Sequence, residues 1–307
     1  MDVKSYLKAA RLRTLPLSIS GIIMGVFLGN IATNTSHNYL HAIFSSSVFW
    51  LAILTTIGFQ VLSNFANDYG DGVKGTDKIR LGEARMVSSG KITPKQMKVA
   101  MIITTILTLL VALCLIYVSF GKDNFVYSIL FFVLGISSIV AAIKYTVGNS
   151  AYGYHGFGDV FVFLFFGILS VVGSYFLVTK NIDYPIFLPA ISVGLLSVAV
   201  LNLNNLRDFT EDIKNNKNTL VVRLGEKRAK IYHYLLILTA LFTSLLYVYI
   251  NFSSFFELIF LVAFIPLFKN IITVYKNKVS ATLDAELKKV ALSTFLFAIL
   301  FSIGQFF

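Results

Sequence analysis

The stretch "LAILTTIGFQVLSNFANDYGD" (residues 51–71) begins as an uncharged apolar run and ends in a cluster of amides and carboxylates. An apolar helix of about 20 residues is long enough to cross the hydrocarbon core of a bilayer. Acidic groups near that core are costly unless they are hydrated or paired with a cation. The stretch therefore predicts a membrane-crossing helix that delivers carboxylates to one membrane surface.

Similar apolar runs recur along the chain of 307 residues, of which 56% are hydrophobic and only 13% charged. Soluble proteins carry about 25% charged residues. The runs are continuously apolar and do not alternate, which excludes a transmembrane β-barrel. We predict an all-α integral membrane protein, a single domain over residues 1–307, with nine spans. These spans are expected at about 14–34, 42–66, 99–120, 124–146, 157–178, 186–206, 231–250, 255–275 and 289–307.

The formal net charge of +11 would also fit a nucleic-acid-binding protein, so the placement of the basic residues decides. If the N-terminus is cytoplasmic, the nine spans leave all 26 lysines and arginines except Lys122 and Lys180 on the cytoplasmic side. This asymmetry follows the positive-inside rule. It predicts a multi-pass protein of the lipid bilayer with an outward-facing C-terminus, and it argues against nucleic acid as a partner.

Two Asn-x-x-x-Asp pairs end two of the predicted spans. Asn64 and Asp68 end the second span, and Asn204 and Asp208 end the sixth. These spans cross in the same direction, so both pairs meet the same membrane face. The repeat favours two equivalent helices that contribute to one site.

Helical geometry gathers further polar residues around both pairs. At 100° per residue, one polar stripe of the second span holds Asn64, Asn67, Asp68 and Asp71 if the helix continues that far. A second stripe on the sixth span holds Asn204, Asp208 and Asp212. Oxygen ligands without nearby His or Cys favour Mg²⁺ or Ca²⁺ over zinc or copper.

Basic residues surround both acidic groups and suit a polyanion better than a bare ion. They are Lys74, Lys78, Arg80, Arg85, Arg207, Lys214 and Arg223. Mg²⁺ is commonly held by one or two carboxylates together with substrate phosphates. The pattern predicts a Mg²⁺-bridged diphosphate whose long hydrocarbon tail lies among the membrane helices.

Acidic residues within membranes also mark the ion pathways of transporters. A transporter would need acids near the midplane and breaks in paired helices, whereas here the acids gather at one face. A transporter of cations or lipid phosphates stays open as the alternative from another class.

Four stretches of the sequence carry a family resemblance. They are "RLRTLPLSISGIIMG" (11–25), "LSNFANDYGDGVKGTD" (62–77), "YTVGNSAYGYHGFGDVFVFLFFG" (145–167) and "NLNNLRDFTEDIKNNKNTLVVRLG" (202–225). The chain resembles the 1,4-dihydroxy-2-naphthoate polyprenyltransferases of menaquinone synthesis, a branch of the UbiA-type membrane prenyltransferases. The resemblance implies a nine-helix bundle in a bacterial inner membrane, with two cytoplasmic Asp-rich motifs around a central cavity.

The resemblance also implies an activity: Mg²⁺-dependent transfer of a polyprenyl chain from polyprenyl diphosphate to 1,4-dihydroxy-2-naphthoate. Diphosphate and CO₂ leave, and demethylmenaquinol forms. Another aromatic ring or haem stays open as the acceptor. Compared with the ubiquinone branch, Asp71 follows Asp68 by three residues instead of four and Asp77 is extra, which counts against 4-hydroxybenzoate.

The same resemblance assigns roles to residues. The expected metal ligands are Asn64, Asp68, Asp71, Asp208 and Asp212. Together with the polar stripes and the basic residues around them, the resemblance gives the expected substrate contacts Asn64, Asn67, Lys74, Arg85, Asn204, Arg207 and Arg223. Tyr145, Tyr154 and Asp159 match the middle motif, and any of the three could orient or deprotonate the acceptor. His155, beside Tyr154, is a further candidate for contact with the acceptor.

Overall fold

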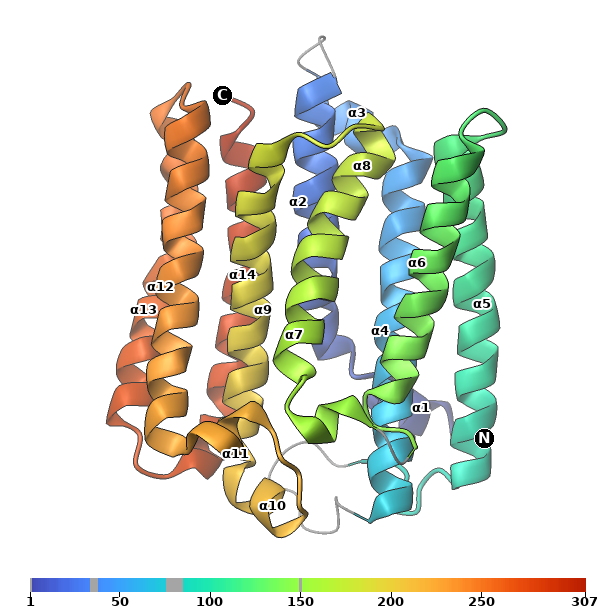
Figure 1. The fold of residues 1–307 in the computed structure, drawn as a ribbon, viewed down its shortest axis with the longest axis vertical. Helices are drawn as coiled ribbons and strands as arrows, with labels where there is room; N and C mark the ends of the chain where they lie inside the picture. Colours follow the sequence, from blue (N-terminus) through green and yellow to red (C-terminus); the bar gives the residue numbers. More distant parts are fainter. Residues whose placement is uncertain (1, 34–37, 76–84, 149–150) are drawn as a thin grey trace.

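The computed structural model describes residues 2–33, 38–75, 85–148 and 151–307. Within these ranges nine helical units are long and apolar enough to cross a membrane, and no strand is formed. The units run side by side along the long axis of the molecule (Figure 1). The all-α fold and the nine predicted spans are therefore confirmed. The units are Val3–Thr33, Ser47–Lys74, Pro94–Phe120, Phe125–Lys144, Gly158–Thr179, Tyr184–Arg207, Glu226–Asn251, Phe255–Lys276 and Ser280–Gly304.

Several of these units are built from more than one helix. The α-helices are α1 (Val3–Ala10), α2 (Leu15–Thr33), α3 (Tyr39–Ser45), α4 (Ser47–Lys74), α5 (Pro94–Phe120), α6 (Phe125–Lys144), α7 (Gly158–Val162), α8 (Gly173–Thr179), α9 (Phe187–Arg207), α10 (Phe209–Lys214), α11 (Leu220–Leu224), α12 (Glu226–Asn251), α13 (Leu261–Lys276) and α14 (Asp284–Gly304). A π-helical stretch, Phe163–Val172, joins α7 to α8. Short 3₁₀ turns lie at Leu12–Thr14, Tyr152–His155, Tyr184–Ile186, Phe255–Phe260 and Ser280–Leu283.

The two acidic motifs end their helices in different ways. Helix α4 continues through Lys74 and ends at Gly75, whose φ of +73° suits glycine. Asp68 and Asp71 are therefore both helical, as the predicted stripe requires. Helix α9 instead ends at Arg207, and the chain bends at Asp208 before α10 begins. The predicted second stripe is thus interrupted at Asp208.

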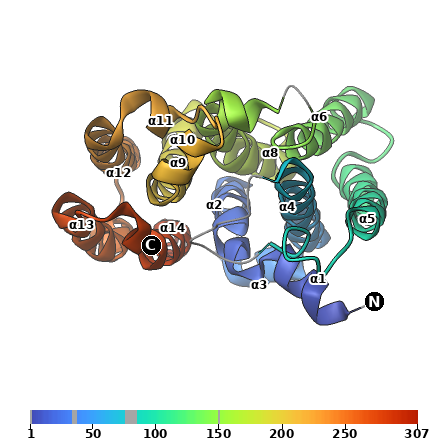
Figure 2. The ribbon, with the colours of Figure 1, turned by 90° about the horizontal axis from the view of Figure 1, so that it is seen from below.

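Close helix packing holds the centre of the bundle. Gly21, Gly25 and Gly29 face the unit that contains α7 and α8, and a Cβ atom at Gly25 would lie under 3.0 Å from the hydroxyl oxygen of Ser174. Small residues let membrane helices approach closely and gain van der Waals contact. Helix α2 therefore packs closely against α8, and it lies between α4, α9 and α14 near the centre of the bundle (Figure 2).

The two termini lie at opposite ends of the bundle. The N-terminus shares its end with α10 and α11, whereas the C-terminus lies at the other end (Figure 1). The helix order places every described lysine and arginine except Lys122 and Lys180 in the half of the bundle that carries the N-terminus. The asymmetry of charge is thus a property of the folded molecule.

Candidate active site

Two adjoining cavities inside the bundle are lined by described residues. The polar chamber has a volume of about 240 Å³ and lies at the end of the bundle that carries the N-terminus. The apolar chamber has a volume of about 340 Å³ and lies among α2, α4, α5, α6 and the unit of α7 and α8. Both chambers are lined by Gln60, Asn67, Tyr145, Val162, Phe166 and Leu201. The chambers therefore meet at this junction.

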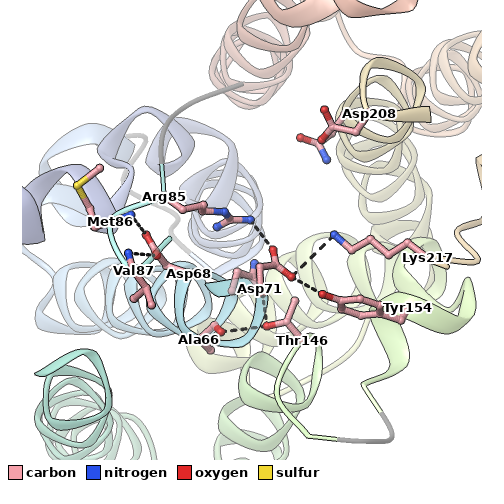
Figure 3. A network of polar contacts seen from close by, with 12 residues as sticks. Ala66, Asp68, Asp71, Arg85, Met86, Val87, Thr146, Tyr154, Asp208 and Lys217 are labelled. Atoms are coloured by element: carbon pink, nitrogen blue, oxygen red, sulfur yellow. Dashed lines mark hydrogen bonds and ion pairs between the residues drawn. The ribbon is translucent and has the colours of Figure 1, made fainter. Parts of the chain in front are cut away.

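The first motif reaches the polar chamber through Asp71. This carboxylate is 1% exposed and forms an ion pair with the guanidinium of Arg85 at 2.9 Å. The hydroxyl of Tyr154 donates a hydrogen bond to it at 2.6 Å, and the ammonium of Lys217 lies 3.9 Å away (Figure 3). Asp71 thus gathers side chains from three segments that are distant in sequence.

The ring of Tyr154 holds two cations. The Nζ atoms of Lys74 and Lys217 lie 4.0 and 4.9 Å from its centroid, which is the distance of a cation–π interaction. Its main-chain carbonyl accepts a hydrogen bond from the N–H of Asn218 at 3.0 Å. Tyr154 therefore connects the end of α4 to the loop after α10. Lys217 lines the polar chamber.

The second motif is organised by Arg207, whose side chain is 1% exposed. Its Nε and Nη2 atoms each donate to the carboxylate of Asp208 at 2.7 Å, and Nη2 also donates to the side chain of Asn204 at 2.9 Å. Its Nη1 donates to Asp284 of α14 at 2.6 Å. Asp208 lies across from Asp71, and both line the polar chamber together with Asp212 (Figure 3).

The first stripe divides between two environments. Asn67 and Asp71 line the polar chamber, whereas Asp68 lines neither chamber among the described residues and accepts from two main-chain N–H groups. Asn64 lines the apolar chamber, and its amide donates to the carbonyl of Ala10 at 2.9 Å. Rotation of 100° per residue explains the split, because Asp68 lies about 60° from Asp71 around the helix.

The residues of the middle motif also separate. Tyr145 lines both chambers, and burial raises the pKa of its hydroxyl, so the protonated form persists. Asp159 lies among neither set of lining residues, and its carboxylate accepts from Tyr232 at 3.1 Å. Of the three candidates, the structure brings Tyr145 and Tyr154 to the polar chamber and leaves Asp159 as a contact between α7 and α12.

Other candidates lie at the periphery. Arg223 donates to the exposed main-chain carbonyl of His155 at 2.7 Å, and neither residue is among those that line the polar chamber. Asp77, Lys78 and Arg80, which the sequence predicts near the site, lie outside the described residues. Lys74 reaches Tyr154 without lining the chamber.

The structure adds residues to which the sequence assigned no role in the site. The polar chamber is also lined by Arg11, Arg13, Asp284 and Lys288. The two arginines lie just before α2. Their sequence context predicts only that they face the cytoplasm. Asp284 and Lys288 begin α14, and nothing in their local sequence marks them. Only the closing of the bundle brings them to the chamber.

The donor set of the polar chamber fits a magnesium diphosphate. Asp71, Asp208 and Asp212 offer carboxylate oxygens, although the described residues contain no ready cluster of three metal-ligating side chains. Two of these acids are balanced by arginine. A metal ion that brings its own diphosphate can take the carboxylates while the phosphates take the guanidinium groups, so buried charge stays paired.

A helical membrane protein with a charged chamber at one end and an adjoining apolar chamber has the architecture expected for an enzyme that acts on a lipid diphosphate. Comparison with known proteins agrees with that class. Residues 23–297 match the family described as "UbiA prenyltransferase family". The chain belongs to this family.

Two relatives cover nearly the whole chain. A protein of Haemophilus influenzae, named 1,4-dihydroxy-2-naphthoate octaprenyltransferase, is 42% identical over 98% of this chain and 96% of its own length. A protein of the same name from Escherichia coli is 41% identical over 99% of this chain and 95% of its own length. A solved UbiA homologue from Archaeoglobus fulgidus, described as bound to GPP and Mg²⁺, has a TM-score of 0.63 at 13% identity, covering 97% of this chain and 99% of that one. The latter likeness concerns the fold.

Proposed function

We propose that this protein transfers a polyprenyl chain from polyprenyl diphosphate to 1,4-dihydroxy-2-naphthoate, with Mg²⁺ as cofactor, to give demethylmenaquinol. The supporting observation is the junction of the two chambers, where a charged head group and an apolar tail can be held at once. The names of the two long relatives support the naphthoate as acceptor over another aromatic ring or haem. The setting is a bacterial inner membrane, with the polar chamber on the cytoplasmic side.

The diphosphate binds in the polar chamber, where Asp71, Asp208 and Asp212 would hold Mg²⁺. When bound, the metal supplies positive charge opposite the oxygens of the leaving diphosphate. Arg85 and Arg207 line the same chamber and further stabilise the negative charge that develops on the diphosphate as the allylic C–O bond breaks. The electron pair of this bond leaves with the diphosphate.

The allylic cation forms at the junction. Tyr145 and Phe166 present aromatic rings there, beside Val162 and Leu201. Aromatic faces stabilise a cation, and apolar walls exclude the water that would hydrolyse it. The electron-rich ring carbon that carries the carboxylate forms the new C–C bond. The bond to the carboxylate then breaks, its electrons return to the ring, and CO₂ leaves.

Transport fits the chambers less well. Among the described residues that line the apolar chamber there is no Asp, Glu, Lys or Arg. An ion that left the polar chamber toward the opposite membrane face would meet Phe, Leu and Ile side chains and neutral Ser, Thr, Asn and Gln side chains, but no opposite charge among these described residues. An uncharged passage suits a hydrocarbon tail and opposes an ion pathway.

The Asp208→Asn variant tests the proposal, because it removes charge with little change of shape. With polyprenyl diphosphate and dihydroxynaphthoate in membranes, we expect turnover to fall by about 100-fold or more. Glu211→Gln is the matched control, since Glu211 pairs with Lys214 one turn away and does not line the polar chamber. Its turnover should stay within about twofold.

Mass spectrometry of products from a panel of aromatic acceptors decides the substrate. We expect prenylation with decarboxylation for the naphthoate alone. Near-normal turnover by Asp208→Asn, or a preferred acceptor other than the naphthoate, would contradict the proposal.

A further inference from the structure

Asp68 occupies a closed environment. Its side chain is 1% exposed, and Oδ2 and Oδ1 accept hydrogen bonds from the main-chain N–H groups of Met86 and Val87, each at 2.9 Å (Figure 3). Met86 and Val87 are buried in an apolar cluster with Leu62 and Phe65 of α4. A carboxylate in this cluster satisfies two N–H groups that would otherwise be buried without a partner.

The segment that Asp68 holds is a compact turn. Within it the N–H of Ser89 donates to the carbonyl of Arg85 at 3.1 Å, and the N–H of Ile92 donates to the carbonyl of Met86 at 3.1 Å. The N–H groups at the start of a helical turn have no partner within the turn. Asp68 supplies that partner from another helix, in the way that an N-cap side chain does.

The same turn is attached to α4 at a second point. One helical turn after Asp68, the carboxylate of Asp71 pairs with the guanidinium of Arg85 inside the polar chamber. Directly after Asp71, α4 presents Gly72, where a Cβ atom would lie 2.6 Å from Cγ1 of Val87. Asp68 thus holds the main chain of the turn, and Asp71 holds the side chain of Arg85.

We propose that Asp68 is a positioning residue: it fixes the main chain of residues 85–87 so that Arg85 is held in the polar chamber, and it is not a ligand of the metal. This inference rests on the proposed function and revises the role expected for Asp68 from the motif. The two acids of the first motif then have different roles. Asp71 faces the diphosphate, and Asp68 places the arginine that binds it.

The test measures binding instead of turnover. The purified full-length protein is titrated with Mn²⁺ and inorganic pyrophosphate, bound Mn²⁺ is counted by electron paramagnetic resonance, and pyrophosphate affinity is measured by calorimetry. For Asp68→Asn we expect unchanged Mn²⁺ stoichiometry and a pyrophosphate Kd raised about tenfold, the weight of one contact to a charged group. For Asp71→Asn we expect loss of bound Mn²⁺. Equal loss of Mn²⁺ in both variants would overturn the proposal.

A double-mutant cycle with Arg85→Ala shows whether Asp68 acts through Arg85. If it does, adding Asp68→Asn to Arg85→Ala leaves the pyrophosphate Kd nearly unchanged. A full further loss in the double variant would refute the inference. Hydrogen exchange of residues 85–92 should accelerate in Asp68→Asn, and unchanged exchange would also refute it.

Gly72→Ala keeps the idea testable if Asp68→Asn does not fold. It displaces the turn without touching an acid, so we expect the same rise of the pyrophosphate Kd with Mn²⁺ binding preserved. A wild-type Kd in Gly72→Ala would count against positioning by the docked turn. Absence of Mn²⁺ and pyrophosphate binding by the wild-type protein would instead refute the proposed function.

Discussion

Asp71 and Asp208 are both proposed metal ligands and both members of ion pairs with arginine. Each is paired with an arginine in the polar chamber, at 2.9 and 2.7 Å. Removing one member of a buried ion pair is strongly destabilising, because it leaves an uncompensated charge. The two arginines therefore stabilise the buried acids in the fold. Under the proposed function the same arginines also bind the diphosphate.

Tyr145 gives a prediction about pH. Burial raises the pKa of its hydroxyl above the ordinary value of about 10, so this group stays protonated across the physiological range. It can donate a hydrogen bond to the acceptor but cannot act as a base there. For Tyr145→Phe we expect kcat to fall about tenfold while the pH profile between about pH 6 and pH 9 keeps its shape. Loss of the rising limb of that profile would assign Tyr145 as a base instead.

At the scale of elements, α2 is the helix that organises the bundle. Its glycine face contacts the unit of α7 and α8, and the 3₁₀ turn that precedes it brings Arg13 and Thr14 to the polar chamber. The π-helical stretch Phe163–Val172 turns Phe165 and Phe166 toward the apolar chamber, while Gly167 meets Gly194 of α9. Close backbone contact on one face leaves room for the chamber on the other.

Gly25→Ala tests this packing. The added Cβ atom would press on Ser174 and on the carbonyl of Val171, and overpacking of this kind costs about 1–3 kcal/mol. We expect the Tm in detergent to fall by several degrees. Gly135→Ala on α6 is the control, because a Cβ atom there meets nothing within 4 Å. Equal Tm values for the two variants would show that α2 does not depend on this close approach.

For the whole molecule, charge divides the two ends of the bundle. The polar chamber, the N-terminus and nearly all basic residues share one end. Positive charge is retained on the cytoplasmic side during membrane insertion. We therefore predict an orientation in which the proposed diphosphate site faces the cytoplasm.

Cysteine labelling tests this orientation in a Cys114→Ser background, since Cys114 is the only native cysteine. Lys91 and Asp123 are both exposed and lie in loops at opposite ends of α5. In intact spheroplasts, a membrane-impermeant maleimide should label Asp123→Cys at once and Lys91→Cys only after permeabilisation. The reverse pattern would place the polar chamber on the outer side.

Local physics explains what could be predicted from the residues. The span from 42 to 66, the acids that follow it and the distribution of lysine and arginine depend on hydropathy, helical geometry and insertion rules, which act on each segment by itself. For this reason the nine spans agree with the structure. The meeting of Asp71 and Asp208 at one chamber also followed, because both helices run in the same direction.

The sequence alone determined a nine-span helical bundle with acids and bases gathered at one face. Only the tertiary structure decided which acid faces the chamber: Asp68 turns to the main chain of Met86 and Val87, while Asp71 turns to Arg85. It also decided the partner of Arg207, since Asp284 lies 77 residues away along the chain. The physical reason is that a side chain's partner depends on which helix face is covered and by what, and that is set only when distant segments pack together.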